Sequence, residues 1–251
     1  MIYKVCVAYD GSNYAGWQKQ INALGVQEVI EKALRRILKS DVDIVASGRT
    51  DAKVHATGQV FHFESDSDIP CKKYKDAMNA LLPKDIRIKS VQAANDDFHA
   101  RFCAKRKRYE YFCTYEKENP FVYPYKEILL YPIDIKKMQE AAKVFLGVHD
   151  FTSFSSSKID PRKPREKNIY QIDIRQEDKD IHFIFEGNGF LRYQVRMMVG
   201  TLLAVGRDKI KTADVQKMLD ARDKEACRYN ASPQGLYLTK VYYEENLDET
   251  D

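Results

Sequence analysis

Residues 47–63, "SGRTDAKVHATGQVFHF", join a short polar and charged run to a segment that alternates apolar and polar side chains. The alternation in "GQVFHFES" (58–65) predicts a β-strand, and "DIVAS" (43–47) predicts another. An arginine, a threonine and an aspartate therefore stand together in the connection between two predicted strands.

The segments on either side of this connection complete a β-α-β-β-α-β order. Residues 25–39 predict an amphipathic helix, because their apolar side chains recur every three or four positions and charged side chains occupy the other face. The remaining elements of this half are strands at 2–9 and 85–94 and a helix at 72–83 that ends at Pro83. This order is typical of a ferredoxin-like, or split βαβ, unit.

The second half repeats the order of elements without repeating the residues. The sequence predicts strands at 108–115, 168–176, 181–187 and 235–244, helices at 136–147 and 190–205, and an extra helix at 212–221. We therefore expect an α+β fold of two tandem ferredoxin-like (β-α-β-β-α-β) subdomains, residues 1–103 and 104–251. The two would join into one extended antiparallel sheet with helices on one face.

The composition excludes several classes of protein. The chain has 251 residues and a net charge of +4, and its N-terminal residues "MIYKVCVAYDG" do not have the pattern of a signal peptide. No run of uncharged apolar residues is long enough to span a membrane. The five cysteines form no C-x-x-C pair and the five histidines are dispersed. We therefore expect a cytoplasmic protein with reduced thiols, no metal and no cofactor.

Basic residues gather in three runs, mostly in the second half, next to aromatic side chains. Such a mixture suits an RNA partner, because cations meet phosphates while rings stack on bases. Any single run is equally typical of an ordinary solvated surface. The three runs are Arg101, Lys105, Arg106, Lys107 and Arg108; Lys158, Arg162, Lys163, Arg165 and Lys167; and Arg192, Arg196 and Arg207.

Arg49 and Asp51 are open to two interpretations. In the structural one, Gly48 permits a tight turn, Thr50 or Asp51 bonds a backbone N–H and Arg49 is an exposed partner. In the functional one, Asp51 is a nucleophilic or basic carboxylate that a nearby cation keeps ionised. The same choice applies to His55, which could contact a substrate, although a structural hydrogen bond is the stronger interpretation.

Several stretches, in order along nearly the whole chain, resemble the TruA family of tRNA pseudouridine synthases. "GRTDAKVHATGQV" is similar to the family's signature loop, which usually reads G-R-T-D-x-G-V-H-A or close to it. The other stretches that resemble the family are "YDGSNYAGWQ", "GVQEVIEKAL", "FHARFCAKRKRYEY", "GVHDFTSF", "GNGFLRYQVRMMVGTLLAVGRDK" and "ASPQGLYLTKVYY".

The resemblance implies an isomerase that converts uridine to pseudouridine in the anticodon stem-loop of tRNA, at positions 38–40, as a homodimer. Asp51 is then the essential carboxylate, acting either as nucleophile at the sugar or as base on a route through a glycal. Arg49 is expected to occupy the space of the flipped nucleotide or to grip its backbone. Tyr109 is expected to stack on the uracil and Leu191 to pack on its other side. Arg196 is expected to pair with Asp51 and keep it ionised.

Lys53 departs from the glycine that the family commonly has there or next to it. If the loop needs a positive φ at this position, lysine costs free energy that glycine would not. Lys53 could alternatively reach an RNA phosphate, and the expected phosphate contacts also include Arg106, Arg108 and Arg192.

Other interpretations remain open at this level. Tyr109 also fits cross-strand packing, Leu191 fits a core position, and the single tryptophan, Trp17, fits the core better than an RNA surface. At the level of function, a non-catalytic RNA-binding protein would share the basic runs, and a carboxylate hydrolase acting on RNA would share Asp51.

Overall fold

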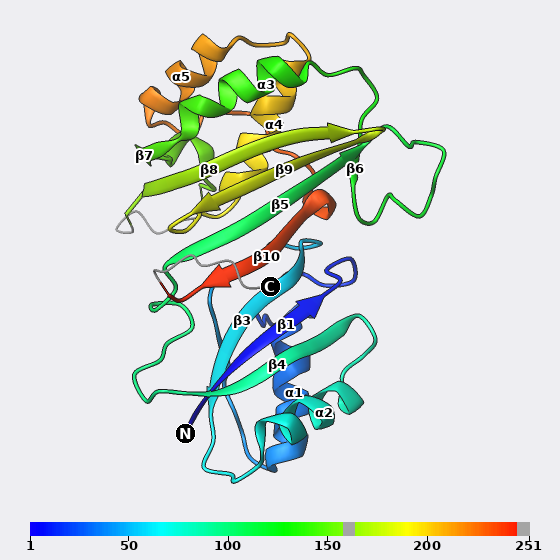
Figure 1. Ribbon diagram of the computed structural model, residues 1–251, viewed down its shortest axis with the longest axis vertical. Helices are drawn as coiled ribbons and strands as arrows, with labels where there is room; N and C mark the ends of the chain where they lie inside the picture. The colour runs from blue at the N-terminus through cyan, green and yellow to red at the C-terminus, as the bar shows by residue number, and fades with distance from the viewer. Residues whose placement is uncertain (158–163, 245–251) are drawn as a thin grey trace. The chain divides into compact units, whose positions relative to one another are not determined.

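The computed structural model describes residues 1–157 and 164–244 of the chain (Figure 1). The chain divides into two compact units. Unit 1 is Met1–Lys105 together with the described residues from Tyr237 onward, and unit 2 is Arg106–Leu236. Both units contain helices and antiparallel strands, which confirms the predicted α+β class.

Unit 1 has the predicted β-α-β-β-α-β order. β1 pairs antiparallel with both β3 and β4, and the short β2 pairs antiparallel with β3. The last strand of the chain, β10, adds to this sheet by pairing parallel with β3, Tyr237 opposite His55. The elements are β1 (Ile2–Tyr9), α1 (Val26–Leu38), β2 (Val45–Ala46), β3 (His55–Glu64), α2 (Cys71–Leu81), β4 (Ile86–Ala94) and β10 (Leu236–Tyr242).

The core of unit 1 lies between this sheet and its two helices. α1 and α2 contact each other and lie on one face of the sheet (Figure 1). Ile30 and Leu34 of α1, and Tyr74 and Met78 of α2, are completely buried. Trp17 is only 2% exposed. Its ring lies 5.9 Å from that of Tyr9 and 6.0 Å from that of Phe61, which confirms its predicted core position.

The strand predicted at residues 43–47 is shorter than expected. Val45–Ala46 form the strand that pairs with β3, and the Ser47 N–H also donates to the Val60 carbonyl at 2.7 Å. The preceding residue, Ile44, has its backbone N–H and C=O bonded to the side chains of Glu31 and Gln27 on α1 instead of to a strand. Side chains of a helix have therefore replaced the ladder partners of this segment.

Unit 2 is built on an antiparallel sheet in the order β5-β9-β8-β7, with the short β6 parallel to β5. α3 packs against α4 and α5 and contacts β8. The elements are β5 (Arg106–Thr114), β6 (Glu127–Ile128), α3 (Ile135–Ala142), the 3-10 turns η1 (Lys143–Phe145) and η2 (Thr152–Phe154), β7 (Gly147–Asp150), β8 (Glu166–Glu177), β9 (Asp180–Gly187), α4 (Gln194–Gly206), α5 (Thr212–Ala221) and the 3-10 turn η3 (Pro233–Gly235).

The two helices predicted at 136–147 and 190–205 are longer than the helices observed there, α3 and α4. α3 ends at Ala142, a 3-10 turn follows, and Gly147, with φ of 91°, begins the unpredicted strand β7. α4 begins at Gln194 and not at residue 190. Tyr193 has φ of 70°, a left-handed conformation that an α-helix cannot contain, so the residues before Gln194 form a turn.

The tandem ferredoxin-like description is not confirmed by these pairings. Unit 2 carries β6 and β7 in addition to the predicted strands, and the strand predicted to close it, β10, pairs with β3 of unit 1. The expected division into residues 1–103 and 104–251 stays a prediction.

Candidate active site

The residues from Gly48 to Val54, here called the Asp51 loop, connect β2 to β3. The buried side chain of Gln59 on β3 holds the start of the loop. Its Nε2 donates to the Gly48 carbonyl at 2.9 Å, and its Oε1 accepts from the Ser47 hydroxyl at 2.7 Å. At the other end, the Val54 N–H donates to the Asp51 carbonyl at 3.1 Å and closes a turn. The loop is therefore anchored at both ends.

Two glycines of an earlier segment press against the backbone of the Asp51 loop. A Cβ at Gly16, where φ is 96°, would lie 2.5 Å from the Thr50 carbonyl oxygen. A Cβ at Gly11 would lie 2.1 Å from the Val54 carbonyl oxygen. Both distances are below any real contact, so only glycine permits this close packing. The Trp17 N–H adds a hydrogen bond of 3.2 Å to the Thr50 carbonyl.

The side chains of the loop differ in exposure. Thr50 is buried, and its hydroxyl lies 2.8 Å from that of Tyr9. Burial raises the pKa of Tyr9 above its usual value. Asp51 is half-buried and Arg49 is exposed. The loop thus inserts its threonine into unit 1 and leaves the predicted catalytic side chains within reach of solvent.

Lys53 has the positive φ that the sequence analysis considered for this position. Its φ is 64°, in the left-handed region, so the loop does have a positive φ here, and the free-energy cost expected for lysine in place of glycine stays a prediction. The Lys53 N–H donates to the Tyr14 carbonyl at 3.2 Å, and its side chain is exposed.

His55 is buried at the start of β3. Its Nδ1 accepts a hydrogen bond of 3.0 Å from the Gly11 N–H, and its ring stacks on Tyr237 with centroids 4.6 Å apart. Asp10 Oδ1 lies 3.2 Å from the same Nδ1. These contacts favour the structural interpretation of His55. A contact with substrate stays a prediction.

In unit 2, the residues from Gly187 to Tyr193, here called the α4 turn, carry the second group of predicted site residues. A Cβ at Gly187 would lie 2.7 Å from the Asn168 carbonyl oxygen, so the turn begins at another close backbone approach. Gln194, fully buried, holds its end: Oε1 accepts from the Leu191 N–H at 2.8 Å, and the Gln194 N–H donates to the Leu191 carbonyl at 3.1 Å. Leu191 is thereby fixed and half-buried.

Arg196 is oriented on the first turn of α4. Its Nε donates to the Ala231 carbonyl at 2.8 Å, and its own carbonyl accepts from the Ala231 N–H at 2.9 Å. The guanidinium carbons of Arg192 and Arg196 lie 4.9 and 5.2 Å from the ring centre of Tyr193, within range of cation–π attraction. The ring at the positive-φ position therefore supports both cations.

The segment that binds Arg196 is itself anchored. The Tyr111 hydroxyl on β5 reaches both the Glu127 carboxylate and the Ser232 carbonyl, the latter at 2.7 Å, and Glu127 Oε2 accepts from the Ser232 N–H at 3.1 Å. Burial, followed by the charge of Glu127, raises the pKa of Tyr111 well above its usual value. The phenol stays a donor, which holds the chain next to Ala231 in place.

Tyr109 lies on β5 beside the α4 turn. It is 8% exposed and opposite Phe185 on β9, and its ring meets that of Phe190 edge-on with centroids 5.1 Å apart. Phe190 directly precedes Leu191. Unit 2 therefore places the predicted uracil-stacking residue next to the turn that carries Leu191, while the stacking itself stays a prediction.

Two of the predicted phosphate-binding arginines are engaged with carboxylates. Arg106 Nη1 lies 2.8 Å from Glu186 Oε2, and Arg108 Nε lies 2.9 Å from Glu110 Oε1. Glu186 is only 4% exposed. These acids offset the charge of both arginines, so contact of the two with RNA phosphate stays a prediction. Lys158, Arg162 and Lys163 of the second basic run lie outside the described residues.

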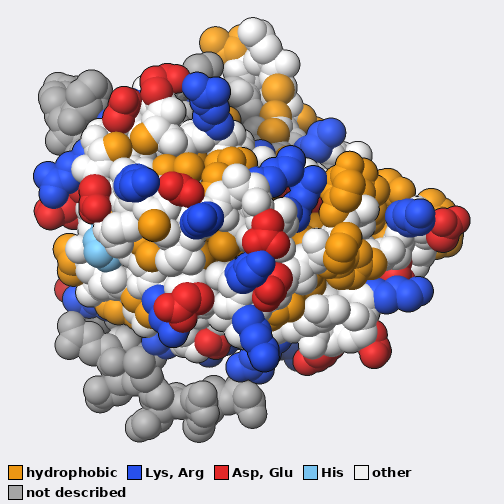
Figure 2. Space-filling view, turned by 90° about the horizontal axis from the view of Figure 1, so that it is seen from above, with side chains coloured by type: hydrophobic (Ala, Val, Ile, Leu, Met, Phe, Trp, Pro, Cys, Tyr) orange, Lys and Arg blue, Asp and Glu red, His pale blue; other side chains and the backbone are white. Residues whose placement is uncertain are grey.

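The surface of unit 2 that carries α3 and α5 shows charges of both signs intermixed (Figure 2). Apolar side chains gather to one side, and the exposed members of the segment between β5 and α3 are Phe121, Tyr123, Tyr125, Leu130 and Tyr131. An open hollow of about 510 Å³ adjoins this segment, lined in part by Tyr115, Leu129 and Ile133, and none of the predicted site residues lines it.

Within the part of the chain that the structure describes, no three His, Cys, Asp or Glu side chains are grouped as a metal would require. No described helix has the length and apolar character to cross a membrane.

Sequence reasoning assigned no role to several residues that contact the Asp51 loop, among them Gly11, Gly16 and Gln59. Gly11 and Gly16 belong to the stretch "YDGSNYAGWQ", where a glycine inside a polar loop signals a close backbone approach. Gln59 is a polar residue within the apolar strand run, which signals an internal hydrogen bond.

Comparison with known proteins decides the family. A family model described as tRNA pseudouridine synthase matches residues 5–103 and 141–244. The chain belongs to this family. Its members are isomerases that convert uridine to pseudouridine. Asp51, Arg49, Leu191 and Arg196 lie within the matched segments, and Tyr109 lies between them.

Curated relatives match along almost their whole length, and each is named tRNA pseudouridine synthase A, or TruA. The protein of Exiguobacterium sp. AT1b is 44% identical over 96% of this chain and 97% of its own. That of Oceanobacillus iheyensis is 43% identical over 97% of both chains, and that of Bacillus subtilis is 41% identical over 97% of this chain and 100% of its own. The suspected resemblance to the TruA family is therefore confirmed.

Likeness to solved structures is low. A chain in the crystal structure of a Cbf5-Nop10-Gar1 complex aligns with 80% of this chain and 45% of its own length, at 14% identity and a TM-score of 0.40. That degree of likeness supports no inference about this chain.

Proposed function

We propose that this protein converts uridine to pseudouridine at positions 38–40 of the tRNA anticodon stem-loop, with Asp51 as the essential carboxylate. Family membership supports the reaction. The observation that carries the role of Asp51 is its place in a loop whose backbone is packed against Gly16 and bonded to Trp17, while its side chain remains half-exposed. A rigid loop with a reachable carboxylate is what a positioned catalytic group requires.

The reaction is an isomerisation, and its atoms balance without a second reactant. The N1–C1′ bond of the uridine breaks, the uracil turns, and C5 forms a new bond to C1′. The proton that leaves C5 is balanced by one gained at N1. Asp51 serves either as nucleophile at C1′, which splits the substitution into two steps, or as base on a route through a glycal.

The exposed cations of the Asp51 loop are suited to the extruded nucleotide. A base inside a stem must leave its stack, at a cost of a few kcal/mol. Arg49 and Lys53 lie two residues on either side of Asp51, and both side chains are exposed. We assign Arg49 to the space or backbone of the flipped nucleotide and Lys53 to a neighbouring phosphate.

Tyr109, Leu191 and Arg196 complete the proposal from unit 2. Tyr109 stacks on the uracil, Leu191 packs on the other side of the base, and Arg196 pairs with Asp51. Stacking of a base on an aromatic ring contributes about 1–3 kcal/mol. The hydrogen bond of Arg196 to Ala231 and its contact with Tyr193 support a role that needs a fixed guanidinium. The protein would act in the cytoplasm as a homodimer with tRNA bound.

The test is to incubate the purified protein with unmodified tRNA transcripts and map pseudouridine at single-nucleotide resolution. The expected result is modification at positions 38–40 in RNA of unchanged length and mass. Strand breaks or free uracil would identify a carboxylate hydrolase. Binding of tRNA without any modification would identify a non-catalytic RNA-binding protein.

A further inference from the structure

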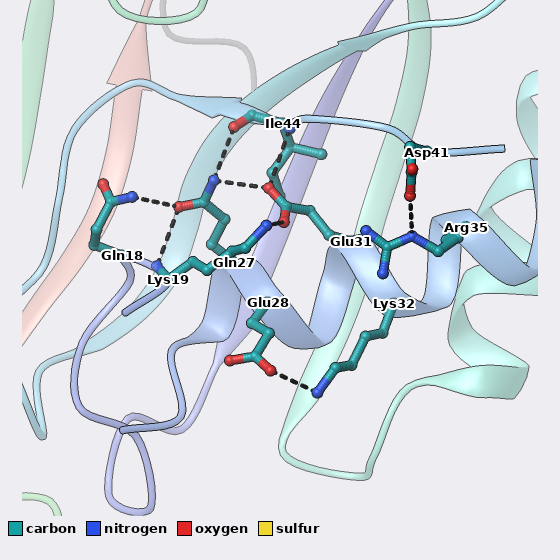
Figure 3. A network of polar contacts seen from close by, with 9 residues as sticks. All are labelled: Gln18, Lys19, Gln27, Glu28, Glu31, Lys32, Arg35, Asp41 and Ile44. Atoms are coloured by element: carbon teal, nitrogen blue, oxygen red, sulfur yellow. Dashed lines mark hydrogen bonds and ion pairs between the residues drawn. The ribbon is translucent and has the colours of Figure 1, made fainter. Parts of the chain in front are cut away.

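A buried carboxylate on α1 has no part in the chemistry described so far. Glu31 is 1% exposed. Its Oε1 accepts from the Gln27 side-chain amide at 2.8 Å and from the Ile44 N–H at 3.4 Å, and its Oε2 lies 3.0 Å from Lys19 Nζ (Figure 3). A buried charge is destabilising unless it is paired and hydrogen-bonded, and this one has three partners from three segments of unit 1.

Gln27, one helical turn before Glu31, extends the network. Its Oε1 accepts from Gln18 Nε2 at 3.0 Å and from the Lys19 N–H at 3.2 Å. Its Nε2 donates to the Ile44 carbonyl at 3.3 Å as well as to Glu31 (Figure 3). The bond to Glu31 fixes which end of the amide faces the loop at Gln18 and Lys19.

The first segment held by this network is the one that packs on the Asp51 loop. The Gln27 N–H donates to the Trp17 carbonyl at 2.9 Å, and the Trp17 N–H donates to the Thr50 carbonyl at 3.2 Å. A Cβ at Gly25 would lie 2.4 Å from the Gln18 carbonyl oxygen, so the loop is packed directly on the start of α1. One side of the Asp51 loop is thus supported through residues bonded to Gln27 and Glu31.

The second segment is the chain that enters the Asp51 loop. Ile44 is bonded through both its N–H and its carbonyl to Glu31 and Gln27, and β2 and Ser47 follow it directly. Three residues separate Ile44 from the start of the Asp51 loop at Gly48. The same carboxylate therefore holds the entrance of the loop and the segment packed against it.

We infer that Glu31 is a positioning residue for Asp51: through Gln27, Lys19 and Ile44 it fixes the two segments that set the place of the catalytic loop. This inference rests on the proposed function. Glu31 touches no substrate in this account. Its effect on the reaction comes from the geometry of Asp51, and a misplacement of about 1 Å can reduce a rate by about 100-fold.

The test is Glu31→Gln in the full chain, with kcat and KM for a tRNA transcript measured separately. The amide keeps the size of the side chain and an acceptor for Gln27, but it turns an N–H toward the Lys19 ammonium. We expect kcat to fall by about 10- to 100-fold, while KM and the Kd for tRNA change by less than about twofold.

The matched control is Glu28→Gln on the same helix. Glu28 is paired with Lys32 at 2.5 Å on the exposed side of α1, away from Ile44 and Lys19 (Figure 3). Its loss should leave kcat, KM and Kd unchanged. A second control separates positioning from loss of stability: Met78→Ala in α2 should lower Tm at least as much as Glu31→Gln and leave the kcat of the folded protein unchanged.

An unchanged kcat in Glu31→Gln would overturn the inference and leave the proposed function standing. An equal fall of kcat in Met78→Ala would overturn it as well, because the effect would then follow stability. If the unmodified chain forms no pseudouridine, the proposed function and the inference both fail.

Discussion

The Asp51 loop of unit 1 and the α4 turn of unit 2 are each held in a fixed conformation, but by different kinds of contact. Each contains a non-glycine residue at positive φ, Lys53 at 64° and Tyr193 at 70°. The Asp51 loop is held by the backbone of another segment, through Gly11, Gly16 and Trp17. The α4 turn is held largely by a side chain of its own helix, Gln194.

The difference extends to the charged residues. In the Asp51 loop, Arg49 is exposed, and the loop is contacted by backbone atoms of another segment, by the Gln59 side chain and through buried Thr50. In the α4 turn, the guanidinium groups of Arg192 and Arg196 lie over the ring of Tyr193. Close backbone packing therefore contributes to the fixed shape of the Asp51 loop, whereas the α4 turn uses the Tyr193 ring to orient its cations.

The largest effect is expected at Gly16. Gly16→Ala introduces a Cβ 2.5 Å from the Thr50 carbonyl at φ of 96°, and it should lower the free energy of unfolding by about 3 kcal/mol or more and reduce kcat by at least 10-fold. Gly147→Ala is the control, because it has a similar φ of 91° and its nearest contact is 3.9 Å away. In denaturant unfolding, the control should lose about 1–2 kcal/mol of the free energy of unfolding. Equal losses would show that close packing on the loop contributes nothing.

An intermediate effect is expected at Arg196. Arg196→Lys removes the bond of Nε to Ala231 and the contact of the guanidinium with the Tyr193 ring, so stability should fall by about 1–2 kcal/mol. If Arg196 also pairs with Asp51, kcat should fall by at least about 10-fold, because lysine does not reproduce the planar fork of arginine.

The matched variant is Arg192→Lys in the same turn. Arg192 is exposed, so its stability change should stay within about 0.5 kcal/mol. Equal effects of the two substitutions on kcat would contradict a special role for Arg196.

Smaller effects of opposite sign are expected when the two positive-φ residues are changed to glycine. Lys53→Gly relieves left-handed strain and should stabilise the protein by up to about 1 kcal/mol. Tyr193→Gly relieves similar strain but removes the ring under Arg192 and Arg196, so the net change should be destabilising. Thermal unfolding measures both. A stabilised Tyr193→Gly would show that the ring does not support the α4 turn.

The smallest effect concerns pH. Burial, with His99 nearby, lowers the pKa of His62 on β3, and its Nδ1 accepts from the Ala100 N–H at 3.1 Å. The unfolded chain therefore takes up this proton first as pH falls below about 6.5, and stability present above that pH is lost on acidification. The α4 turn contains no histidine. His62→Gln should reduce the dependence of Tm on pH between about 7 and 5, and an unchanged dependence would contradict this assignment.

Local patterns predicted much of the fold. The strand predicted at 2–9 and the helical period of 25–39 correspond to β1 and α1 within one residue at each end. The predictions were wrong where tertiary contacts replaced local ones. Ile44 reads as strand but bonds to α1, and the apolar residues Phe190 and Leu191 read as helix but precede a left-handed Tyr193. Neither the bonds of Ile44 to α1 nor the left-handed conformation of Tyr193 can be read from the residue pattern.

The site shows the same limit. The charged residues of "GRTD" stood out because they interrupt two strands, and the glycine usual in the family pointed to the positive φ at Lys53. The engagement of Arg106 with Glu186 could not be predicted, because the two residues meet only through the register of β5 and β9. The network around Glu31 likewise depends on segments that are distant in sequence.

The central claim, that Asp51 performs the reaction, is tested most directly by Asp51→Asn. Pseudouridine formation in a tRNA transcript and the Kd for the same transcript should be measured on one preparation, with Tm as a check on folding. The account predicts a loss of kcat of about 10⁴-fold or more with Kd nearly unchanged. A variant that still forms pseudouridine at the rate of the unmodified protein would contradict it.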